Sequence, residues 1–408
     1  MDNAVDDRDN GMGGGLLGRV FRSLRHRWNH YSEERRLAPL YSPDASNLDI
    51  DAHISAAVDW LERAQDAGTD RGVSYGVQFG SDWDPSYPET TGYICQTFVH
   101  LWLKTGDRNL LDRAVAMGDW EVEIQMPSGA VMGGKYGPDQ TPAVFNTGMV
   151  LLGWAELIRH TGEERFKVAA TRASEWLLSV QEPDGNWIRG NSVFVGGSEN
   201  TYNVKAAWGL CEAGLALDRP DFVQAAVRNA EFCLTRQTAN GWFEHCDLEE
   251  PDNPLLHTIA YTMQGLVEIG RLVKRQDFID AARKTADVEI SIMGPDGFLP
   301  GTQNARFEGP TWACLTGCAQ TSIVCRILFE LTKESKYREA AAKLNRYVMA
   351  HHDIRNTDPR IRGGLAGSWP VQGDYGRLLI LNWATKFLVD ALCLEKYSGS
   401  FGSTWGTR

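Results

Sequence analysis

The sequence PETTGY at residues 88–93 opens a helical segment whose polar start recurs along the chain at intervals of about 55–60 residues, lengthening before the last copy. The further copies are FNTGMV at 145–150, ENTYNV at 199–204, LHTIAY at 256–261, CLTGCAQ at 314–320 and a looser LNWATK at 381–386. This spacing is typical of a supersecondary unit rather than of a domain. The chain is therefore expected to repeat one helical hairpin.

Two kinds of helix alternate around these openings. Each opening leads into a nearly continuous apolar run, such as MVLLGWAELI at 149–158, which predicts a buried helix. Each intervening segment, such as FKVAATRASEWLL at 166–178, has the pattern of an amphipathic helix. The prediction is an all-α fold, one (α/α)6 toroid over residues 46–397. A flexible arm is expected at 1–45 and a disordered tail at 398–408.

The turns between the helices carry a resemblance to known families. QEPDGNW at 181–187 and QTANGW at 237–242 resemble the QW repeat of terpenoid cyclases and prenyltransferases, which are also toroids. The alternation of inner and outer helices is similar to that of six-hairpin glycosidases and toroid polysaccharide lyases. DWDPSYPETTGY at 82–93 and LAGSWPVQGDYGRLLILNWATKF at 365–387 look like segments of proteins from bacterial polysaccharide gene clusters. The resemblance implies a toroid that acts on carbohydrate.

The resemblance to terpenoid cyclases stops at their DxDD motif, which is missing. The nearest segment, DLEE at 247–250, has the acids in other positions. The QW-like turns are therefore interpreted as ties between repeats, in which Gln and Trp bind neighbouring helices.

Composition limits the partners. The 408 residues carry a net charge of −12, which argues against nucleic acid as a partner. The eight cysteines fall mostly in apolar helices, which predicts buried thiols in a cytoplasmic protein. No metal or cofactor is expected, and the expected partner is a poly- or oligosaccharide. The oligomeric state does not follow from the sequence.

Residues 16–36 form a basic amphipathic pattern. Leu17, Val20, Phe21, Leu24 and Trp28 share one face of a helix, and arginines occupy the other. Such a helix could lie on an anionic membrane surface, or it could pack against the toroid or a partner subunit. Peripheral membrane association through 16–36 is therefore one expectation.

Two carboxylates are the first catalytic candidates. Glu89 begins an inner helix, and Asp374 precedes the last one; in a closed ring these two hairpins are neighbours. Glycoside hydrolysis needs a pair of carboxyl groups on either side of the scissile bond. The alternative for Glu89 is a structural role at the helix N-terminus, where acids are stabilised.

A second constellation suggests proton transfer at carbon. His257 and Tyr261 are four residues apart on one helix, and Tyr202 and Asn203 lie at the opening before it. This set looks like that of toroid lyases, in which a Tyr or His removes the C5 proton of a uronate. The alternative is that His257 caps its helix and Tyr261 packs in the ring.

Aromatic and polar residues near the openings complete the expected site. Sugar rings stack on aromatic faces, and neighbouring polar groups fix their orientation. The expected substrate-binding residues are Asp82, Trp83, Asp84, Tyr93, Tyr202, Asn203, Gln320, Trp369, Tyr375, Arg377 and Trp383. Lys386 interrupts an apolar helix and so needs a partner, with Asp390 or Glu395 as candidates.

The function expected from the sequence is therefore a glycoside hydrolase acting on a bacterial polysaccharide or oligosaccharide through Glu89 and Asp374. A uronate lyase or C5-epimerase using His257, Tyr261 and Asn203 is the first alternative. A non-catalytic glycan-binding or scaffold protein of polysaccharide biosynthesis is the second. A terpenoid cyclase remains a minor alternative.

Overall fold

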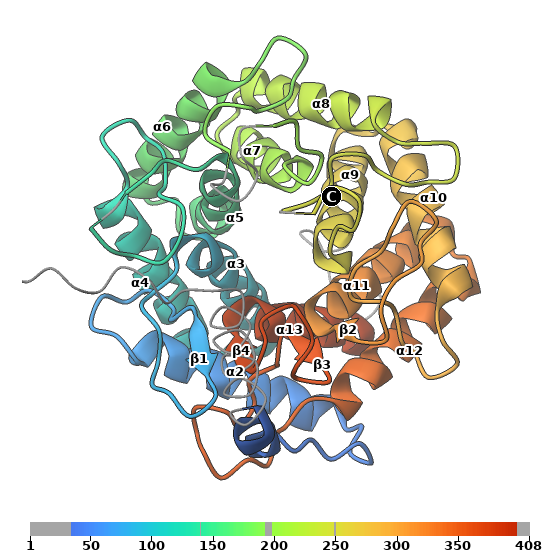
Figure 1. Cartoon of the computed structure of the whole chain (residues 1–408). Coiled ribbons are helices and arrows are strands. Elements are labelled where there is room, and N and C mark those ends of the chain that lie inside the picture. Colours follow the sequence, from blue (N-terminus) through green and yellow to red (C-terminus); the bar gives the residue numbers. More distant parts are fainter. Residues whose placement is uncertain (1–33, 139, 192–197, 249, 398–408) are drawn as a thin grey trace, which may run out of the picture.

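The computed structural model describes residues 34–138, 140–191, 198–248 and 250–397, which form two concentric rings of helices (Figure 1). The inner ring consists of α3 (Pro88–Thr105), α5 (Val144–Thr161), α7 (Val204–Ala216), α9 (Leu256–Val273), α11 (Leu315–Thr332) and α13 (Asn382–Lys396). The outer ring consists of α2 (Ile50–Asp66), α4 (Arg108–Ile124), α6 (Glu164–Val180), α8 (Pro220–Thr235), α10 (Gln276–Ile292) and α12 (Ser335–Ala350). The predicted (α/α)6 toroid is confirmed.

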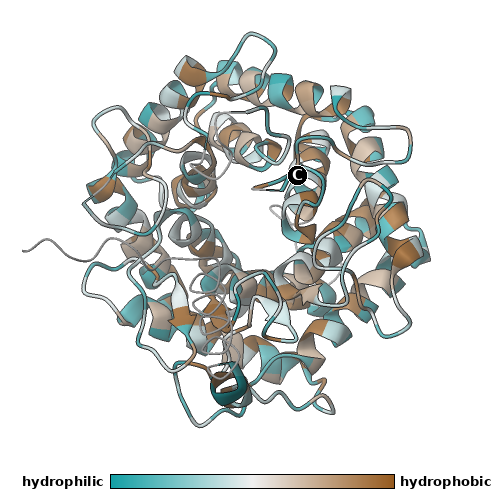
Figure 2. Cartoon of the chain, in the orientation of Figure 1, coloured by the Kyte–Doolittle hydropathy of each residue, from teal (hydrophilic) through white to brown (hydrophobic). Residues whose placement is uncertain are grey.

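Hydrophobicity separates the two rings as the sequence pattern predicts. In α5 every residue from Val144 to Ile158 is buried, because this helix is covered by its inner neighbours and by α6. In α6 the buried positions Phe166, Ala169, Ala173 and Leu177 recur every three or four residues along one face. Figure 2 shows polar residues mainly on the outer helices and on the loops.

Glycine lets the inner helices come close together. A Cβ atom on Gly153 of α5 would overlap the carbonyl oxygen of Gly92 in α3. A Cβ atom on Gly209 of α7 would overlap the carbonyl oxygen of Gly148 in α5. The small residues in the repeat therefore set the spacing of neighbouring inner helices.

The QW-like turns tie adjacent hairpins together, as predicted. The Gln181 side-chain amide donates to the carbonyl oxygens of Gly185 in its own turn (3.0 Å) and of Ala225 in α8 (2.9 Å). Gln125 and Gln237 make equivalent bonds to α6 and α10. The indole of Trp187 donates to the Leu177 carbonyl at 3.0 Å.

The first and last parts of the described chain close the ring. Helix α2 packs against α13, and strand β1 (Gly76–Gln78) pairs antiparallel with β4 (Leu379–Leu381), with Gly76 opposite Leu381. Strand β2 (Ala313–Cys314) pairs with β3 (Ser368–Trp369). These short strands are additions to a helical fold.

Residues 34–45, from the segment expected to be an arm, include the short 3-10 helix η1 (Ala38–Leu40). Tyr41 is buried there, and its hydroxyl donates to the His351 carbonyl at 2.8 Å. Most of the predicted amphipathic helix at 16–36, and the tail at 398–408, lie outside the described residues. Within the described ranges, no helix is long and apolar enough to cross a membrane.

Two lysines are buried in the inner ring with side-chain partners. Lys386 pairs with Asp390 at 2.6 Å, as the sequence analysis suggested, and Asp390 also accepts from the Thr97 hydroxyl at 2.8 Å. Lys205 donates to the Gln264 side-chain carbonyl at 2.7 Å. All eight cysteines are buried with free thiols.

Candidate active site

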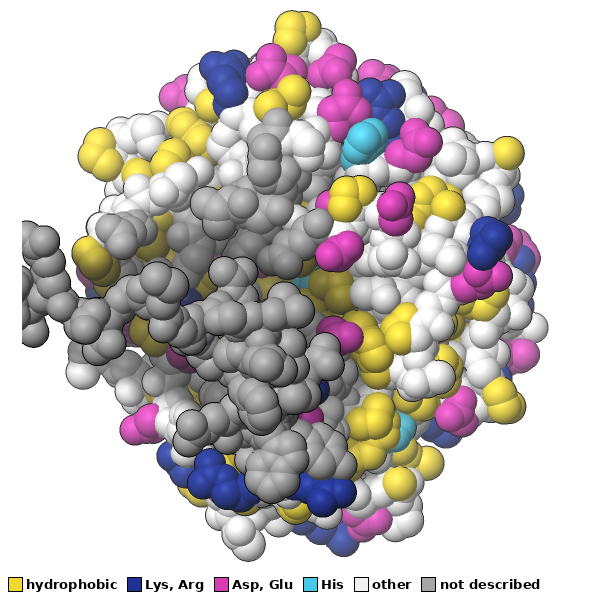
Figure 3. All heavy atoms as spheres, in the orientation of Figure 1, with side chains coloured by type: hydrophobic (Ala, Val, Ile, Leu, Met, Phe, Trp, Pro, Cys, Tyr) yellow, Lys and Arg dark blue, Asp and Glu magenta, His cyan; other side chains and the backbone are white. Residues whose placement is uncertain are grey.

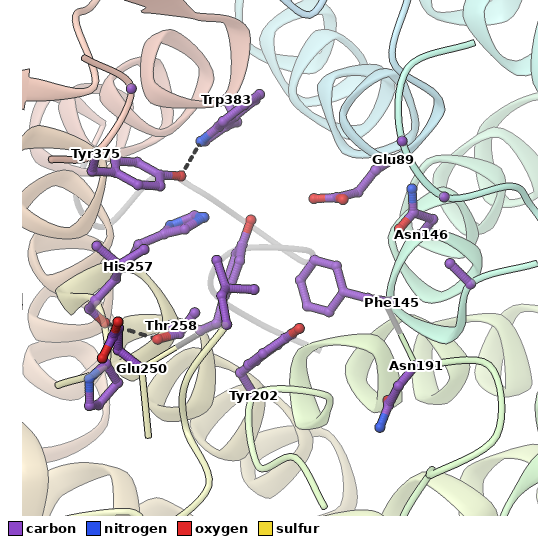
Figure 4. A pocket seen from close by; sticks show the side chains of 18 of the residues that line it. Glu89, Phe145, Asn146, Asn191, Tyr202, Glu250, His257, Thr258, Tyr375 and Trp383 are labelled. Atoms are coloured by element: carbon purple, nitrogen blue, oxygen red, sulfur yellow. Dashed lines mark hydrogen bonds between the residues drawn. The ribbon is translucent and has the colours of Figure 1, made fainter. Parts of the chain in front are cut away.

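A cavity of about 940 Å³ opens at the centre of the inner ring, where the N-termini of the inner helices meet the loops that precede them (Figure 4). Aromatic, amide and carboxyl side chains line it. The lining includes Tyr75, Tyr87, Glu89, Phe145, Asn146, Asn191, Tyr202, Glu250, His257, Thr258, Tyr261, Trp312, Asp374, Tyr375 and Trp383.

The helical repeat itself places several of these side chains. The second residue of each of four inner helices, α3, α5, α9 and α13, lines the cavity: Glu89, Phe145, His257 and Trp383. The first turns of these helices therefore present one repeat position to a shared space. What differs between the repeats is the chemistry placed there.

Glu89 is a carboxyl group in a mostly apolar setting. It projects from the first turn of α3 into the cavity (Figure 4), and the Tyr87 hydroxyl donates to its Oε2 at 2.9 Å. Burial raises the pKa of Glu89 to about 7, against a smaller opposing effect of the Tyr87 hydrogen bond. Glu89 therefore exchanges its proton near neutral pH, as a general acid requires.

His257 is held in one orientation by a side chain from the next inner helix. Its Nδ1 lies 2.6 Å from Oε1 of Gln320 on α11, so an Nδ1–H can donate to that amide oxygen. Burial lowers the pKa of His257 to about 3, so the ring is neutral at pH 7. With the proton on Nδ1, Nε2 carries the free lone pair.

Tyrosine hydroxyls gather beneath His257. The ring of Tyr261 lies 4.2 Å from that of His257, centroid to centroid, and 5.0 Å from that of Phe145. The hydroxyls of Tyr261 and Tyr93 are neighbours, and neither has another partner among the described residues. Burial raises the pKa of both tyrosines, so both hydroxyls stay protonated.

The wall next to His257 is aromatic, and its residues come from the chain just before and within α3 and α13. The Trp383 indole donates to the Tyr375 hydroxyl at 2.7 Å, and its ring lies 4.8 Å from Tyr75 and 6.0 Å from Tyr87. Tyr375 in turn lies 5.3 Å from His257. These faces form a surface on which the C–H side of a sugar ring can stack.

Two further carboxylates stand at the rim. Asp374 lines the cavity, has a side chain that is 76% exposed, and lies 3.7 Å from Arg377. Glu250 lines the cavity from the loop before α9 and is exposed. The cavity thus has one half-buried carboxyl group inside it and two others at its mouth.

The predicted loop residues 82–84 lie outside the lining. Asp84 pairs with Lys135 at 2.8 Å, and Trp83 packs against Trp60 of α2 at 5.2 Å. Asp82 is exposed and accepts from the backbone N–H of Trp83. The strand pairing of β1 with β4 holds this loop toward the outer ring.

Other predicted binding residues support the cavity from behind or lie apart from it. Gln320 orients His257, and the Asn203 amide donates to the side chain of Asn191, which does line the cavity, at 2.7 Å. Trp369 packs on His351, and Arg377 pairs with Glu34 at 2.6 Å. These residues do not belong to the described lining.

Several lining residues were not predicted. Phe145 and Asn146 belong to the quoted FNTGMV opening, and comparing its register with that of Glu89 would have indicated them. Asn191, Glu250 and Tyr75 lie in loops, whose paths depend on contacts that no local pattern discloses. Over the described ranges, no cluster of three or more His, Cys, Asp or Glu side chains could hold a metal ion.

Solved structures share this fold. A sugar epimerase from a ruminal bacterium matches with a TM-score of 0.70 and 11% identity, over 85% of this chain and 98% of that one. An unsaturated glucuronyl hydrolase specific for heparin matches with a TM-score of 0.67 and 16% identity, over 85% and 96% of the two chains.

A cellobiose 2-epimerase from Bacillus thermoamylovorans matches with a TM-score of 0.67 and 10% identity, over 84% of this chain and 98% of that one. At these identities the likeness establishes the architecture: the chain is an (α/α)6 toroid. No protein-family model and no curated protein sequence matches it.

Proposed function

We propose that this protein is a carbohydrate-active enzyme that hydrolyses a glycosidic bond in an oligosaccharide bound in the central cavity, with Glu89 as the general acid. The observation that carries the proposal is the pKa of Glu89, raised to about 7 by burial, in a carboxyl group that faces an aromatic cavity. A carboxyl group tuned in this way can donate a proton to a leaving oxygen at neutral pH.

The second carboxylate of the pair is Asp374. It lies on the loop before α13, and α13 is a neighbour of α3 in the closed ring, so both acids line one cavity. Asp374 activates water or attacks the anomeric carbon, and Glu89 protonates the departing oxygen.

The aromatic wall binds the sugar. Trp383 is fixed by its bond to Tyr375, so a sugar ring meets a surface whose orientation is already set. The unpaired Nδ2 of Asn146 supplies a donor for hydroxyl recognition at the cavity wall. The solved structures of the same fold include enzymes named for sugars, which supports a saccharide substrate.

The test is hydrolysis of a panel of bacterial oligosaccharides, followed by proton NMR for new reducing-end signals. Glu89→Gln and Asp374→Asn should each remove activity while the protein remains folded. Asp82→Asn, at an exposed carboxylate outside the lining, is the matched control and should remain active. A folded Glu89→Gln variant with full activity would refute the assignment.

A second candidate is proton transfer at a carbon atom, as in a sugar epimerase or a lyase. The observation that favours it is the hydrogen bond from His257 to Gln320, because it leaves Nε2 of a neutral imidazole free to act as a base. Tyr261, whose ring lies 4.2 Å from that of His257, would then be the neighbouring proton donor.

The same NMR experiment in deuterated water separates the two candidates. Epimerisation introduces deuterium at carbon, and a lyase produces vinyl signals. Tyr261→Phe should then be folded and inactive, whereas hydrolysis by Glu89 should continue with weaker binding at most, because it takes no proton from Tyr261. A scaffold would give neither product.

A terpenoid cyclase would also use an aromatic cavity with a buried acid, so it shares part of this description. The buried Nδ2 of Asn146 in the lining favours a hydroxylated substrate instead, because an apolar chain would leave this donor without a partner.

A further inference from the structure

Every ionisable side chain of the described lining that can carry a full charge at neutral pH is a carboxylic acid. Glu89, Glu250 and Asp374 are carboxyl groups, and no Lys or Arg occurs among the described residues of the lining. In Figure 3 acidic and hydrophobic side chains border the visible part of the central hollow, and most Lys and Arg side chains lie toward the periphery of that face. His257, the remaining titratable nitrogen, is neutral because burial lowers its pKa to about 3.

The Lys and Arg side chains beside the lining already have partners. Lys135 pairs with Asp84 at 2.8 Å, and its Nζ lies 4.3 Å from the centroid of the Tyr75 ring. Arg377, which lies 3.7 Å from Asp374 at the rim, pairs more closely with Glu34 at 2.6 Å. Lys205 is buried beneath the site, where burial holds its pKa well below its usual range and disfavours the charged form.

The polar groups available to a ligand are uncharged donors. Nδ2 of Asn146 has no hydrogen-bond partner among the described residues, although the side chain is only 3% exposed and lines the cavity. The buried hydroxyl of Tyr261 is also without a partner other than Tyr93. An unpaired buried amide donor indicates a ligand oxygen that accepts from it.

We propose that the cavity selects sugars without carboxylate, sulfate or phosphate groups: a neutral or amino sugar occupies it, and a uronate is excluded. The inference rests on the proposed carbohydrate-active function and names its substrate class. A carboxylate brought into the cavity would lose its hydration and meet the like charge of Glu250 and Asp374. Hydroxyl groups satisfy Asn146 without that cost, and an ammonium group would be attracted to the rim.

The lining of this cavity differs from what a site specific for glucuronyl groups requires. A uronate needs a cation or several strong donors to replace the water around its carboxylate. The described lining provides amide and phenol groups, and its carboxylates give it a negative electrostatic potential. It therefore also favours hydrolysis of a neutral glycoside over proton abstraction from a uronate.

The test uses matched triads of disaccharides that differ only at the terminal sugar: a hexose, the corresponding uronic acid and the corresponding 2-amino sugar, in gluco, galacto and manno forms. Binding to the full-length protein is measured by titration calorimetry at low and high salt. For the triad that binds, the uronate should bind at least about tenfold more weakly than the hexose at low salt. High salt should narrow that difference.

A charge reversal at the rim tests whether the carboxylates are the reason that the uronate binds more weakly. Glu250→Arg should bring the affinity for the uronate toward that for the hexose, because it replaces a negative charge at the rim by a positive one. The variant should fold, because Glu250 is exposed. The control is Glu339→Arg, an equally exposed acid on outer helix α12, which should leave the ratio unchanged. Equal or tighter binding of the uronate by the unmodified protein would overturn the inference and leave the carbohydrate function intact. Failure of every triad to bind would overturn both.

Discussion

Replacing Glu89 by Gln should make the protein more stable and inactive at once. The pKa of Glu89 rises from 4.5 to about 7 on burial, and each pKa unit corresponds to about 1.4 kcal/mol. Ionising this carboxyl group in the folded protein therefore costs up to about 3 kcal/mol, less whatever solvent in the open cavity recovers. Gln fills the same volume, carries no charge and can still accept from Tyr87.

The stability gained by Glu89→Gln should depend on pH. A carboxyl group whose folded pKa is raised destabilises the folded state once the unfolded chain ionises, which is above about pH 4.5. The extra stability of Glu89→Gln should be smallest below pH 4.5, grow between 4.5 and 7, and stay constant above 7. Urea denaturation at a series of pH values measures it as the difference in unfolding free energy.

Glu289 provides a matched control. It is buried on outer helix α10, accepts from Gln303 at 2.9 Å, and burial raises its pKa to about 7 as well. Glu289→Gln should give a similar stability profile and leave catalysis unchanged, because Glu289 does not line the cavity. The reasoning is refuted if Glu89→Gln gains no stability above pH 7.

Three further substitutions test a close helix contact, a buried ion pair and a buried histidine. Gly153→Ala should lower the unfolding free energy by about 1–3 kcal/mol, seen as a lower Tm, because its methyl group overlaps the Gly92 carbonyl. Lys386→Met should cost about 3–5 kcal/mol in urea denaturation by leaving Asp390 without its cation, and adding Asp390→Leu should restore much of it. Burial lowers the pKa of His352 to about 3, so unfolding free energy should fall as pH drops below about 6.5, and His352→Asn should flatten that slope.

Local patterns were sufficient for the architecture. The apolar runs, the amphipathic runs and the Gln-bearing turns each follow from contacts within one hairpin or between neighbours, so the toroid and its ties could be predicted. The partner of Lys386 lies four residues away on the same helix, and the prediction of Asp390 is confirmed.

Loop conformation limited what could be predicted of the site. The residues from Asp82 to Asp84 were expected at the cavity because they precede an inner helix. The structure holds them near α2 and Lys135 through Trp60 and the pairing of β1 with β4, contacts that join distant parts of the chain. Asn146 lies one residue beyond the repeat position of Glu89, so only the register of the two openings indicates that it faces the cavity. The catalytic roles of Glu89 and Asp374 stay predictions.

The closure of the ring has a consequence for how the protein is made. Helix α2 packs on α13, and β1 pairs with β4. The contacts of residues near 60 and 77 therefore form only after the chain beyond residue 378 has been made. During synthesis the growing chain is an open arc whose two ends expose apolar faces until the last hairpin leaves the ribosome. We expect such an arc to need chaperone protection, and a premature stop before α13 to yield an aggregating product rather than a smaller ring.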